Sequence, residues 1–174
     1  DVGWDLVADN NDNLFVTGYY QNFTEFDATQ LNAEGQSENA RFFIAYYNFS
    51  SEVWDWAKDS DGSGISLGFQ LVHEPSTNDV YVAGYNTGIE VFSDSFTSNP
   101  TSTWAGILIK YNENGSLVWG QNIAGNTCPL GQNCGVYFNN IVLHPNGGVI
   151  VGGNFLIDYK SSLGGGSGKG SWDV

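Results

Sequence analysis

Two sequence landmarks recur along this chain in the same order. The first is a short apolar run with a glycine near its end, and its three copies are Leu14–Tyr19, Val80–Tyr85 and Val149–Asn154. The second is an apolar run closed by tryptophan, in which Trp54 and Trp119 hold matching places 65 residues apart. A unit repeated at a fixed period cannot bury its apolar face alone, so it must stack on copies of itself. The repeat therefore constrains the architecture more than any local pattern does.

The period divides the chain into approximate repeats at 1–64, 65–134 and 135–174, of which the last is truncated. Hydrophobic residues make up 41% of the sequence and aromatic residues 15%, which excludes a disordered polar chain. With 174 residues the chain is long enough for a sizeable core. We therefore expect a single repeat domain.

Each repeat is expected to contain four strands. In the first repeat, Leu6–Val7 is followed by turn residues 9–13, rich in Asp and Asn, and then by the strand that carries Gly18. A long polar excursion precedes a third strand at 42–47, and another turn precedes a fourth at Val53–Ala57. No segment shows the 3.6-residue period of a helix. The chain is predicted to be all-β, with the four antiparallel strands of a β-propeller-like blade in each repeat.

The residues resemble those of secreted β-propeller repeat proteins of bacteria and archaea, known as the seven-bladed β-propeller repeat family. Asp12–Gly18 and Asn78–Gly84 are similar to one strand of that family, and Gly106–Asn112 with Asn114–Trp119 is similar to the following strand pair. The resemblance implies blades that pack face to face. About two and a half blades cannot close a ring of roughly four to eight, so we expect an incomplete ring or an open stack. A longer chain or further copies of this chain would complete it.

Side chains at recurring places in the repeat are predicted to pack between blades. They are Trp54, Trp119, Phe42, Ile107 and Tyr111. The polar excursions at 21–41 and 86–104 are longer than those of a compact blade. We expect them to form large loops on one face.

The chain is strongly acidic. Five Lys and Arg residues stand against 19 Asp and Glu residues, a net charge of −14. Such a charge repels phosphate backbones and anionic membranes, so nucleic acid is excluded as a partner. No run of about eighteen apolar residues is present, so no membrane-spanning helix is expected. The acidity suits a salty exterior in which self-repulsion is screened.

Two further patterns favour export. Asn22, Asn48 and Asn114 each begin an N-glycosylation acceptor sequence, although such sequences also arise by chance in a chain rich in Asn, Ser and Thr. Cys128 and Cys134, separated by five residues, are predicted to form a short-loop disulfide, since a zinc site needs a second pair of ligands. Together they predict an extracellular or cell-surface location.

No catalytic motif stands out in the sequence. His73 and His144, the only histidines, are read as matching strand-end residues, and we expect neither an enzyme nor a cofactor. Asp59 and Asp61 alternate before a glycine as at the start of a calcium loop. The closing glutamate is missing, because position 68 is glycine. An ordinary turn between blades is therefore favoured, and a weak calcium site is the alternative.

The remaining tryptophans leave a second function open. Trp4, Trp56, Trp104 and Trp172 are less constrained by the repeat, and flat aromatic rings stack on sugars. The leading hypothesis is an extracellular, non-enzymatic structural or interaction protein: a surface scaffold, a matrix or filament component, or an adhesin module. Its expected partners are further copies or the remainder of a longer chain. The alternative is a lectin-like propeller that binds glycans.

Overall fold

Every regular element in the described part of the protein is a strand. The computed structural model describes residues 1–33, 40–93, 95–99, 104–124, 134–156, 159–160 and 167–168. For residues 124, 156, 159–160 and 167–168 it describes the backbone alone. The absence of helices from these residues confirms the predicted all-β class.

Two complete four-stranded antiparallel sheets account for most of the fold. The first, in the order β1–β2–β5–β6, contains β1 (Val2–Ala8), β2 (Leu14–Tyr20), β5 (Arg41–Asn48) and β6 (Val53–Asp59). The second, in the order β8–β9–β12–β13, contains β8 (Ser66–Glu74), β9 (Asp79–Asn86), β12 (Ala105–Tyr111) and β13 (Leu117–Ala124). Each has the strand order predicted from the repeat.

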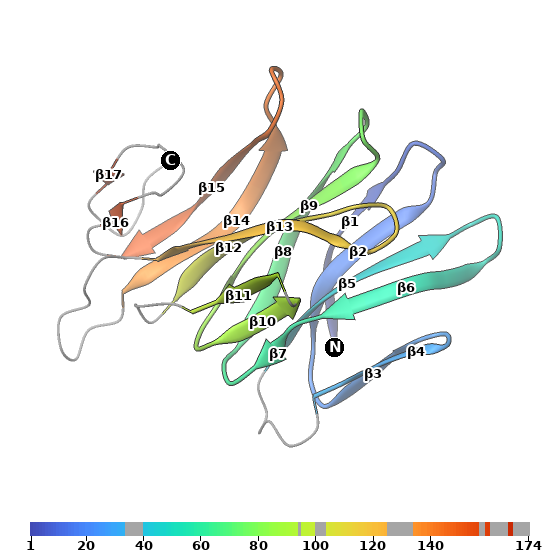
Figure 1. Ribbon diagram of the computed structural model, residues 1–174, viewed down its shortest axis with the longest axis horizontal. Helices are drawn as coiled ribbons and strands as arrows, with labels where there is room; N and C mark the ends of the chain where they lie inside the picture. The colour runs from blue at the N-terminus through green and yellow to red at the C-terminus, as the bar shows by residue number, and fades with distance from the viewer. Residues whose placement is uncertain are drawn as a thin grey trace.

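A third unit begins the same way with β14 (Gly135–Leu143) and β15 (Val149–Leu156), which form an antiparallel pair. Figure 1 shows the three units side by side, with the β1–β2, β8–β9 and β14–β15 turns pointing to the same side. Two short strands, β16 (Tyr159–Lys160) and β17 (Ser167–Gly168), pair with each other nearer the C-terminus. The arrangement is that of incomplete propeller-like blades.

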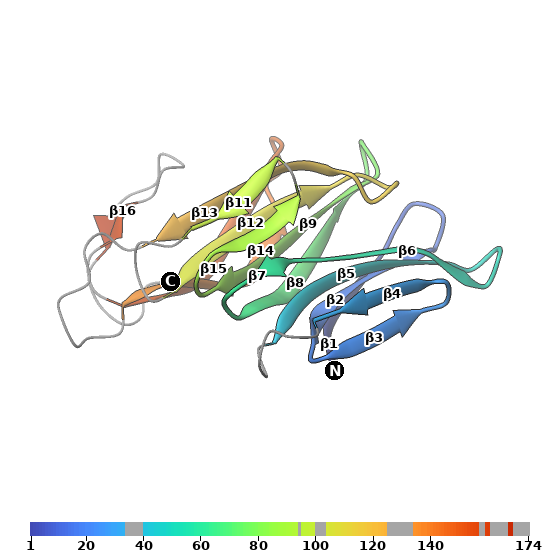
Figure 2. The same cartoon turned by 60° about the horizontal axis from the view of Figure 1, so that its bottom comes forward.

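The two long excursions fold into hairpins, although the sequence analysis predicted loops. The first contains β3 (Phe23–Phe26) and β4 (Thr29–Asn32), which lie alongside β6 (Figure 2). The second contains β10 (Glu90–Ser93) and β11 (Phe96–Ser98), and β10 also pairs with the short strand β7 (Asp61–Gly62). Their strands are only two to four residues long, too short for an alternating pattern to stand out in the sequence.

The first strand of every unit carries the same β-bulge. The pairing register shifts between Gly3 and Asp5 in β1, between Gly68 and Gln70 in β8, and between Phe138 and Asn140 in β14. A bulge inserts one unpaired residue and bends the strand. The inserted residues are Trp4, Phe69 and Asn139.

The bulge explains why each unit has a glycine near the end of its second strand. Gly18, Gly84 and Gly153 pair with the last residue before the bulge. A Cβ atom at these glycines would collide with the carbonyl oxygen of Val2, Leu67 and Tyr137, respectively. The glycine is retained because the bulged strand passes too close for any side chain.

Apolar side chains from neighbouring units meet in two shared cores. The first inter-sheet core joins the first and second sheets and comprises Phe15, Phe42, Ile44, Tyr46, Leu71, Val80, Val82, Phe92, Phe96, Ile107, Ile109 and Tyr111. The second inter-sheet core joins the second sheet to β14–β15 and comprises Tyr81, Ala83, Leu108, Ile123, Val136, Phe138, Ile141 and Phe155. A third cluster lies under the β3–β4 hairpin and includes Phe26, Leu31 and Phe43.

The residues predicted to pack between blades divide among these cores. Phe42, Ile107 and Tyr111 lie in the first inter-sheet core, and Trp119 packs against the second. Trp54 instead packs under the β3–β4 hairpin, with its ring 5.0 Å from that of Phe26.

In the strand pairing, Trp56 occupies the position that is equivalent to Trp119. Lys110 on β12 is opposite Trp119, and Tyr46 on β5 is opposite Trp56. Trp54 and Trp56 share a strand, so spacing in the sequence alone does not show which of them matches Trp119. The cross-strand partner decides, because it determines which face of the sheet a side chain occupies.

Candidate functional site: an aromatic row across three units

Six aromatic side chains form a continuous row that crosses all three units. Successive ring centroids are 6.5, 5.1, 5.6, 5.9 and 6.4 Å apart in the order Tyr19, Trp4, Phe69, Tyr85, Tyr137 and Trp104. Two of the five contacts are edge-to-face, an arrangement that aromatic rings prefer, and the other three are tilted. The row lies at the strand ends opposite the β1–β2 and β8–β9 turns.

The β-bulges place two of these rings. Trp4 and Phe69 are the inserted residues of β1 and β8, and their rings meet edge to face across the boundary between the first two sheets. Tyr19 and Tyr85 each follow the recurring glycine of the second strand. The repeat thus brings two aromatic side chains of each complete sheet to the same end.

The row is accessible to solvent along its length. Trp4 is 51% exposed, and the other five residues are partly exposed. Burial raises the pKa of Tyr85, so its hydroxyl stays protonated at neutral pH and can donate a hydrogen bond. Flat rings flanked by tyrosine hydroxyls suit a ligand with apolar faces and polar edges.

Only part of this row was predicted from the sequence. Trp4 and Trp104 were named as candidates, and the structure brings both into one row. Tyr19, Phe69, Tyr85 and Tyr137 were not predicted. The β-bulges could not be located from the sequence. The recurrence of a tyrosine directly after Gly18 and Gly84 was the available signal.

The other two tryptophans named with Trp4 and Trp104 lie elsewhere. Trp56 stacks against Tyr46 at the first inter-sheet core, with ring centroids 5.8 Å apart and planes 14° apart. Trp172 lies outside the described residues.

A polar clip fixes the β1–β2 hairpin to the third strand of its sheet. The hydroxyl of Tyr46 donates to Asp9 Oδ2 at 2.7 Å and accepts from Asn13 Nδ2 at 2.9 Å. Burial and the bond to Asp9 raise the pKa of Tyr46 to about 12. Burial alone would raise the pKa of Asp9, but hydrogen bonds from Tyr46 and from the backbone of residues 11 and 13 lower it.

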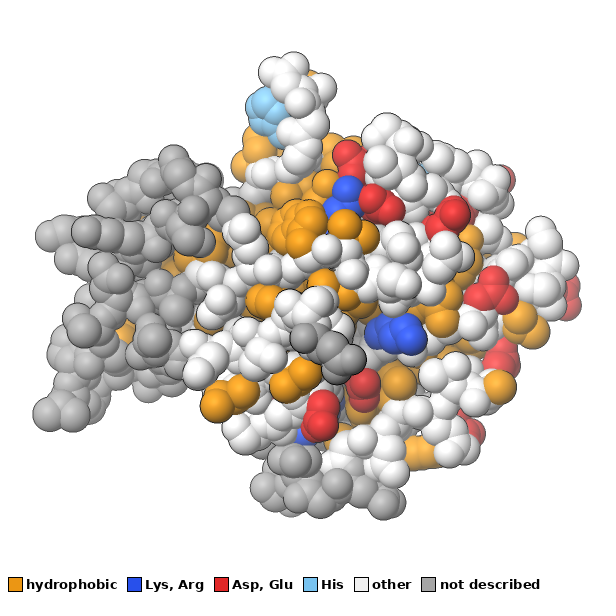
Figure 3. All heavy atoms as spheres, in the orientation of Figure 1, with side chains coloured by type: hydrophobic (Ala, Val, Ile, Leu, Met, Phe, Trp, Pro, Cys, Tyr) orange, Lys and Arg blue, Asp and Glu red, His pale blue; other side chains and the backbone are white. Residues whose placement is uncertain are grey.

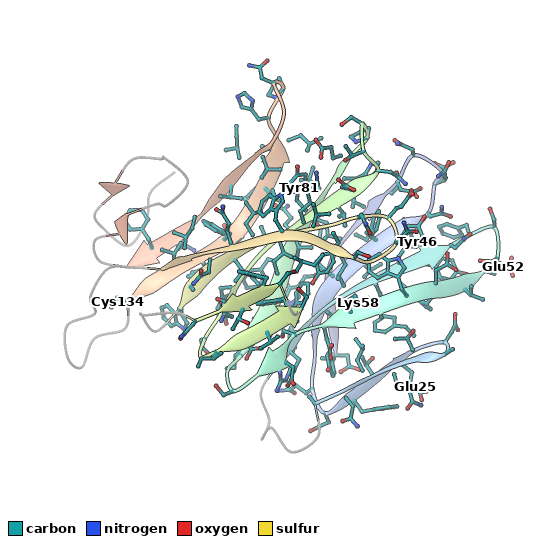
Figure 4. All side chains as sticks on the ribbon, in the orientation of Figure 1. Glu25, Tyr46, Glu52, Lys58, Tyr81 and Cys134 are labelled. Atoms are coloured by element: carbon teal, nitrogen blue, oxygen red, sulfur yellow. The ribbon has the colours of Figure 1, made fainter. Side chains whose placement is uncertain are left out.

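The second sheet has a charged clip at the equivalent place. Lys110 Nζ lies 2.8 Å from Glu74 Oε2 and 2.8 Å from Asp79 Oδ2, and 4.9 Å above the ring of Tyr81. Burial alone would lower the pKa of Lys110, but its bonds to Asp79 and Glu74 raise it. The same bond from Lys110 lowers the pKa of Glu74. Figure 4 labels Tyr46 and Tyr81, which mark the two clips.

A buried arginine links the first sheet to the three-stranded sheet formed by β7, β10 and β11. Arg41 is 1% exposed and donates to the carbonyl oxygens of Ser60 at 3.1 Å and Gly62 at 2.6 Å. Its Nη1 atom also lies 3.7 Å from Glu90 Oε2, and Glu90 is fully buried. Burial raises the pKa of Glu90. These contacts hold together the ends of β5 and β6 and the β10–β11 hairpin.

The two aspartates of the suggested calcium loop have separate partners. Asp59 accepts a hydrogen bond from the Tyr20 hydroxyl, whereas Asp61 lies 3.3 Å from Arg41 Nη1. The segment forms the end of β6 and the short strand β7, so it is not an ordinary turn. Across the described ranges, no group of three His, Cys, Asp or Glu side chains is placed to hold a metal ion.

The two histidines do not match each other in the strand pairing. His73 is opposite Val80 in the second sheet, and the equivalent pair in the third unit is Leu143 with Val149. His73 stacks on Phe15 and makes a 2.8 Å hydrogen bond with Asn78. His144 lies in the turn after β14, where its Nδ1 accepts from the backbone of residue 146.

The predicted modification sites are partly described. Asn22 and Asn114 are exposed, whereas Asn48 is half-buried and its Oδ1 accepts from the backbone N–H groups of Ser50 and Ser51. Cys134 is buried beside the start of β14 (Figure 4), and Cys128 lies outside the described residues. Glycosylation and the disulfide therefore stay predictions.

No family model matches this chain. The chain is similar to an uncharacterized WD repeat-containing protein of Acanthamoeba polyphaga mimivirus, with 25% identity over 151 residues. The match covers 69% of this chain but only 11% of the relative, so the chain spans about a tenth of that protein. Together with the propeller-like sheets, this distant similarity supports a β-propeller repeat fold. Among the described residues, no helix has the length and apolar character needed to cross a membrane.

Proposed function

We propose that this chain is a non-catalytic, β-propeller-type interaction protein that works outside the cell as a surface scaffold, a matrix or filament component, or an adhesive module. The observation that carries the proposal is the shared packing of the three units. Each has the same bulge and the same glycine opposite it, and each buries its face against its neighbour. Such a stack is a rigid platform that presents side chains at fixed spacing.

Several features support a role at the cell exterior, within the secreted family that the sequence resembles. A net charge of −14 keeps a protein soluble where salt screens self-repulsion. Asn22 and Asn114 are accessible acceptors for N-glycosylation. The predicted disulfide between Cys128 and Cys134 belongs to an oxidising compartment.

Labelling of intact producing cells with a membrane-impermeant amine reagent tests the location. Lys58 is exposed on β6 and provides an accessible amine (Figure 4). We expect the chain to be labelled before lysis, while a cytosolic marker in the same culture stays unlabelled. Labelling of the chain only after lysis would contradict an exterior role.

The aromatic row favours carbohydrate as a second candidate partner. Six rings in contact offer a long, partly exposed surface, and Trp4 at 51% exposure is its most open member. Sugar rings have apolar faces that stack on indole and polar edges that tyrosine hydroxyls can bind. This arrangement supports glycan recognition without a deep pocket.

A glycan array with matched variants tests this candidate. We expect Trp4→Ala to lower the array signal at least tenfold, because it removes the most exposed ring of the row. Phe49→Ala is the control, since Phe49 is 52% exposed but lies in the β5–β6 turn, away from the row. Equal signals from Trp4→Ala and the wild type, or no signal from the wild type, would rule out a lectin role for this surface.

A further inference from the structure

The first unit exposes an apolar side chain that the other units bury. Leu6, Leu71 and Ile141 occupy equivalent positions, because each lies two residues after the inserted bulge residue of its strand. Their partners on the second strand are Val16, Val82 and Val151, respectively. Leu71 is 6% exposed and Ile141 is 4% exposed, whereas Leu6 is 60% exposed. Leu71 and Ile141 are covered by the preceding sheet. Leu6 has the same chemistry without that cover.

The third unit in turn exposes apolar side chains that the first two units bury, on the face that points away from the second sheet. Phe15, Tyr81 and Ile150 are equivalent, because they are opposite Val7, Val72 and Val142. Phe15 is fully buried and Tyr81 is 4% exposed, since the following unit covers them. Ile150 is 52% exposed and Val142 is 50% exposed. Among the described residues, the stack therefore presents an exposed apolar face at each end.

The same backbone-to-side-chain hydrogen bond joins both pairs of neighbouring units, and its acceptor position recurs on the exposed face of the third unit. The Leu71 N–H donates to Asp5 Oδ2 at 2.8 Å, and the Ile141 N–H donates to Gln70 Oε1 at 2.8 Å. Asn140 occupies the position of Asp5 and Gln70 in the third unit and is exposed. Its amide oxygen is an acceptor of the same kind. The matching donor on the other end face is the N–H of Leu6.

We propose that a second copy of this chain docks head to tail, with its β1 strand packed on the β14–β15 pair of the first copy. Leu6 of one copy would cover Ile150 of the other, and its N–H would bind Asn140. The chain itself carries both halves of the contact, each built at positions that already pair twice inside the molecule. This inference goes beyond the proposed function, because it follows from the equivalence of the three units and not from the location of the protein.

Two strands of the third unit provide the receiving surface. Inside the molecule, β8 packs on β1, β2 and β5, and β14 packs on β8, β9 and β12. The first strand of each unit therefore docks on the first three strands of the preceding one, and the first two of these are present in the third unit as β14 and β15. The β14–β15 pair presents these two strands to a new β1. Since the two end faces differ, the contact is heterologous and can continue to further copies.

The charge of the chain predicts how this association responds to salt. Each copy carries a net charge of −14, and Figure 3 shows acidic side chains spread over one face with few Lys or Arg residues among them. Two such chains repel each other at low ionic strength. At about 0.5 M NaCl the Debye length falls to roughly 4 Å, so the apolar contact is no longer opposed. Association should strengthen with salt.

Sedimentation velocity on two singly altered chains tests the proposal. Leu6→Asp damages only the inserting face, and Ile150→Asp damages only the receiving face. We expect the wild type to form dimers and longer species as its concentration rises in 0.5 M NaCl, and each variant alone to stay monomeric. A mixture of the two variants should form dimers and nothing longer, because it retains one intact pair of faces.

Two further variants complete the experiment. Phe49→Asp is the matched control, since Phe49 is as exposed as Ile150 but lies in a turn, and it should associate like the wild type. Asn140→Ala should weaken association about fivefold through the loss of one hydrogen bond. Circular dichroism verifies that each variant is folded.

Three results would overturn the proposal. A wild-type chain that stays monomeric at all concentrations and salt levels would show that something other than a second copy covers these faces. Association that survives in Leu6→Asp alone would indicate a symmetric contact through β14–β15. A mixture of the two variants that stays monomeric would exclude head-to-tail docking.

Discussion

Lys110 occupies in the second sheet the position that Tyr46 occupies in the first. Tyr46 is opposite Phe15 and Trp56, and Lys110 is opposite the equivalent residues Tyr81 and Trp119. Both side chains reach the ends of the neighbouring hairpin, where each binds two polar side chains. The same clip is thus made once with a neutral hydroxyl and once with a charged amine.

Replacement of Lys110 by methionine tests the charged clip. Lys110→Met removes two charge-assisted bonds and leaves Glu74 and Asp79 facing each other, so we expect a loss of about 2 kcal/mol in the free energy of unfolding near pH 7. Urea denaturation measures it. Lys58→Met is the control, because Lys58 is exposed, and it should change stability by less than about 0.5 kcal/mol.

The contribution of this clip depends on pH in a defined direction. The pKa of Glu74 is lowered in the folded protein, so its contribution is present above its ordinary pKa of 4.5 and is lost as the pH falls. The pKa of Lys110 is raised, so its contribution is present below 10.5 and is lost as the pH rises through the folded value. The difference between wild type and Lys110→Met should therefore shrink at about pH 3. A difference that stays constant down to that pH would contradict the ion pair.

Replacement of Arg41 tests the buried polar link between the first sheet and the β7–β10–β11 sheet. Arg41→Met leaves the carboxylate of Glu90 buried without its cation, and we expect a loss of about 3 kcal/mol at neutral pH. Burial already raises the pKa of Glu90, so the folded variant binds a proton there more tightly than the unfolded chain does. The loss should therefore become smaller as the pH falls toward 4.5. The double variant Arg41→Met with Glu90→Gln should recover part of the stability at pH 7. If it recovers none, the loss in Arg41→Met does not come from the unpaired carboxylate of Glu90.

Two adjacent glycines in β15 test the effect of the bulge. The Cβ of Gly153→Ala would strike the Tyr137 carbonyl oxygen, and we expect a loss of about 1–3 kcal/mol. The Cβ of Gly152→Ala would lie 3.5 Å from Asn140 Cβ, an ordinary contact, and should be tolerated. Thermal unfolding of both variants side by side gives the comparison. Equal melting temperatures for the two variants would mean that the bulged strand can move away.

The hydrogen bonds between units can be tested at three equivalent positions. Gln70→Ala removes the acceptor of the Ile141 N–H and should cost about 1 kcal/mol, and Asp5→Ala should have a similar effect on the N–H of Leu71. Asn140→Ala is the matched control, because Asn140 is exposed and no following sheet lies against it among the residues that the structure describes. Chemical denaturation of dilute protein should show no loss for this control. A loss equal to that of Gln70→Ala would mean that the side chain at this position acts within its own sheet.

The repeat and most of the sheet topology follow from local patterns in the amino-acid sequence. Glycines at a steady spacing, turn residues before them and apolar runs on either side are local signals, since backbone freedom and strand propensity act over a few residues. They were enough to predict four strands in each complete unit and their order. Phe42, Ile107 and Tyr111 were named as core residues from the same pattern, and all three are buried.

The face of the sheet that each side chain occupies could not be predicted from the sequence and depends on the folded strands. Side chains alternate along a strand, so a shift of one residue, such as the bulge at Trp4 or Phe69, moves the following side chains to the other face. Turn length has a similar effect. Six residues separate the paired Tyr47 and Trp54 but only five separate Tyr111 and Leu117, which is why Trp56 and not Trp54 matches Trp119. The turn after His73 is likewise one residue longer than the turn after Leu143, which is why the histidines do not match. The aromatic row, the clip at Lys110 and the uncovered end faces likewise depend on contacts between residues far apart in the chain, which no local pattern specifies.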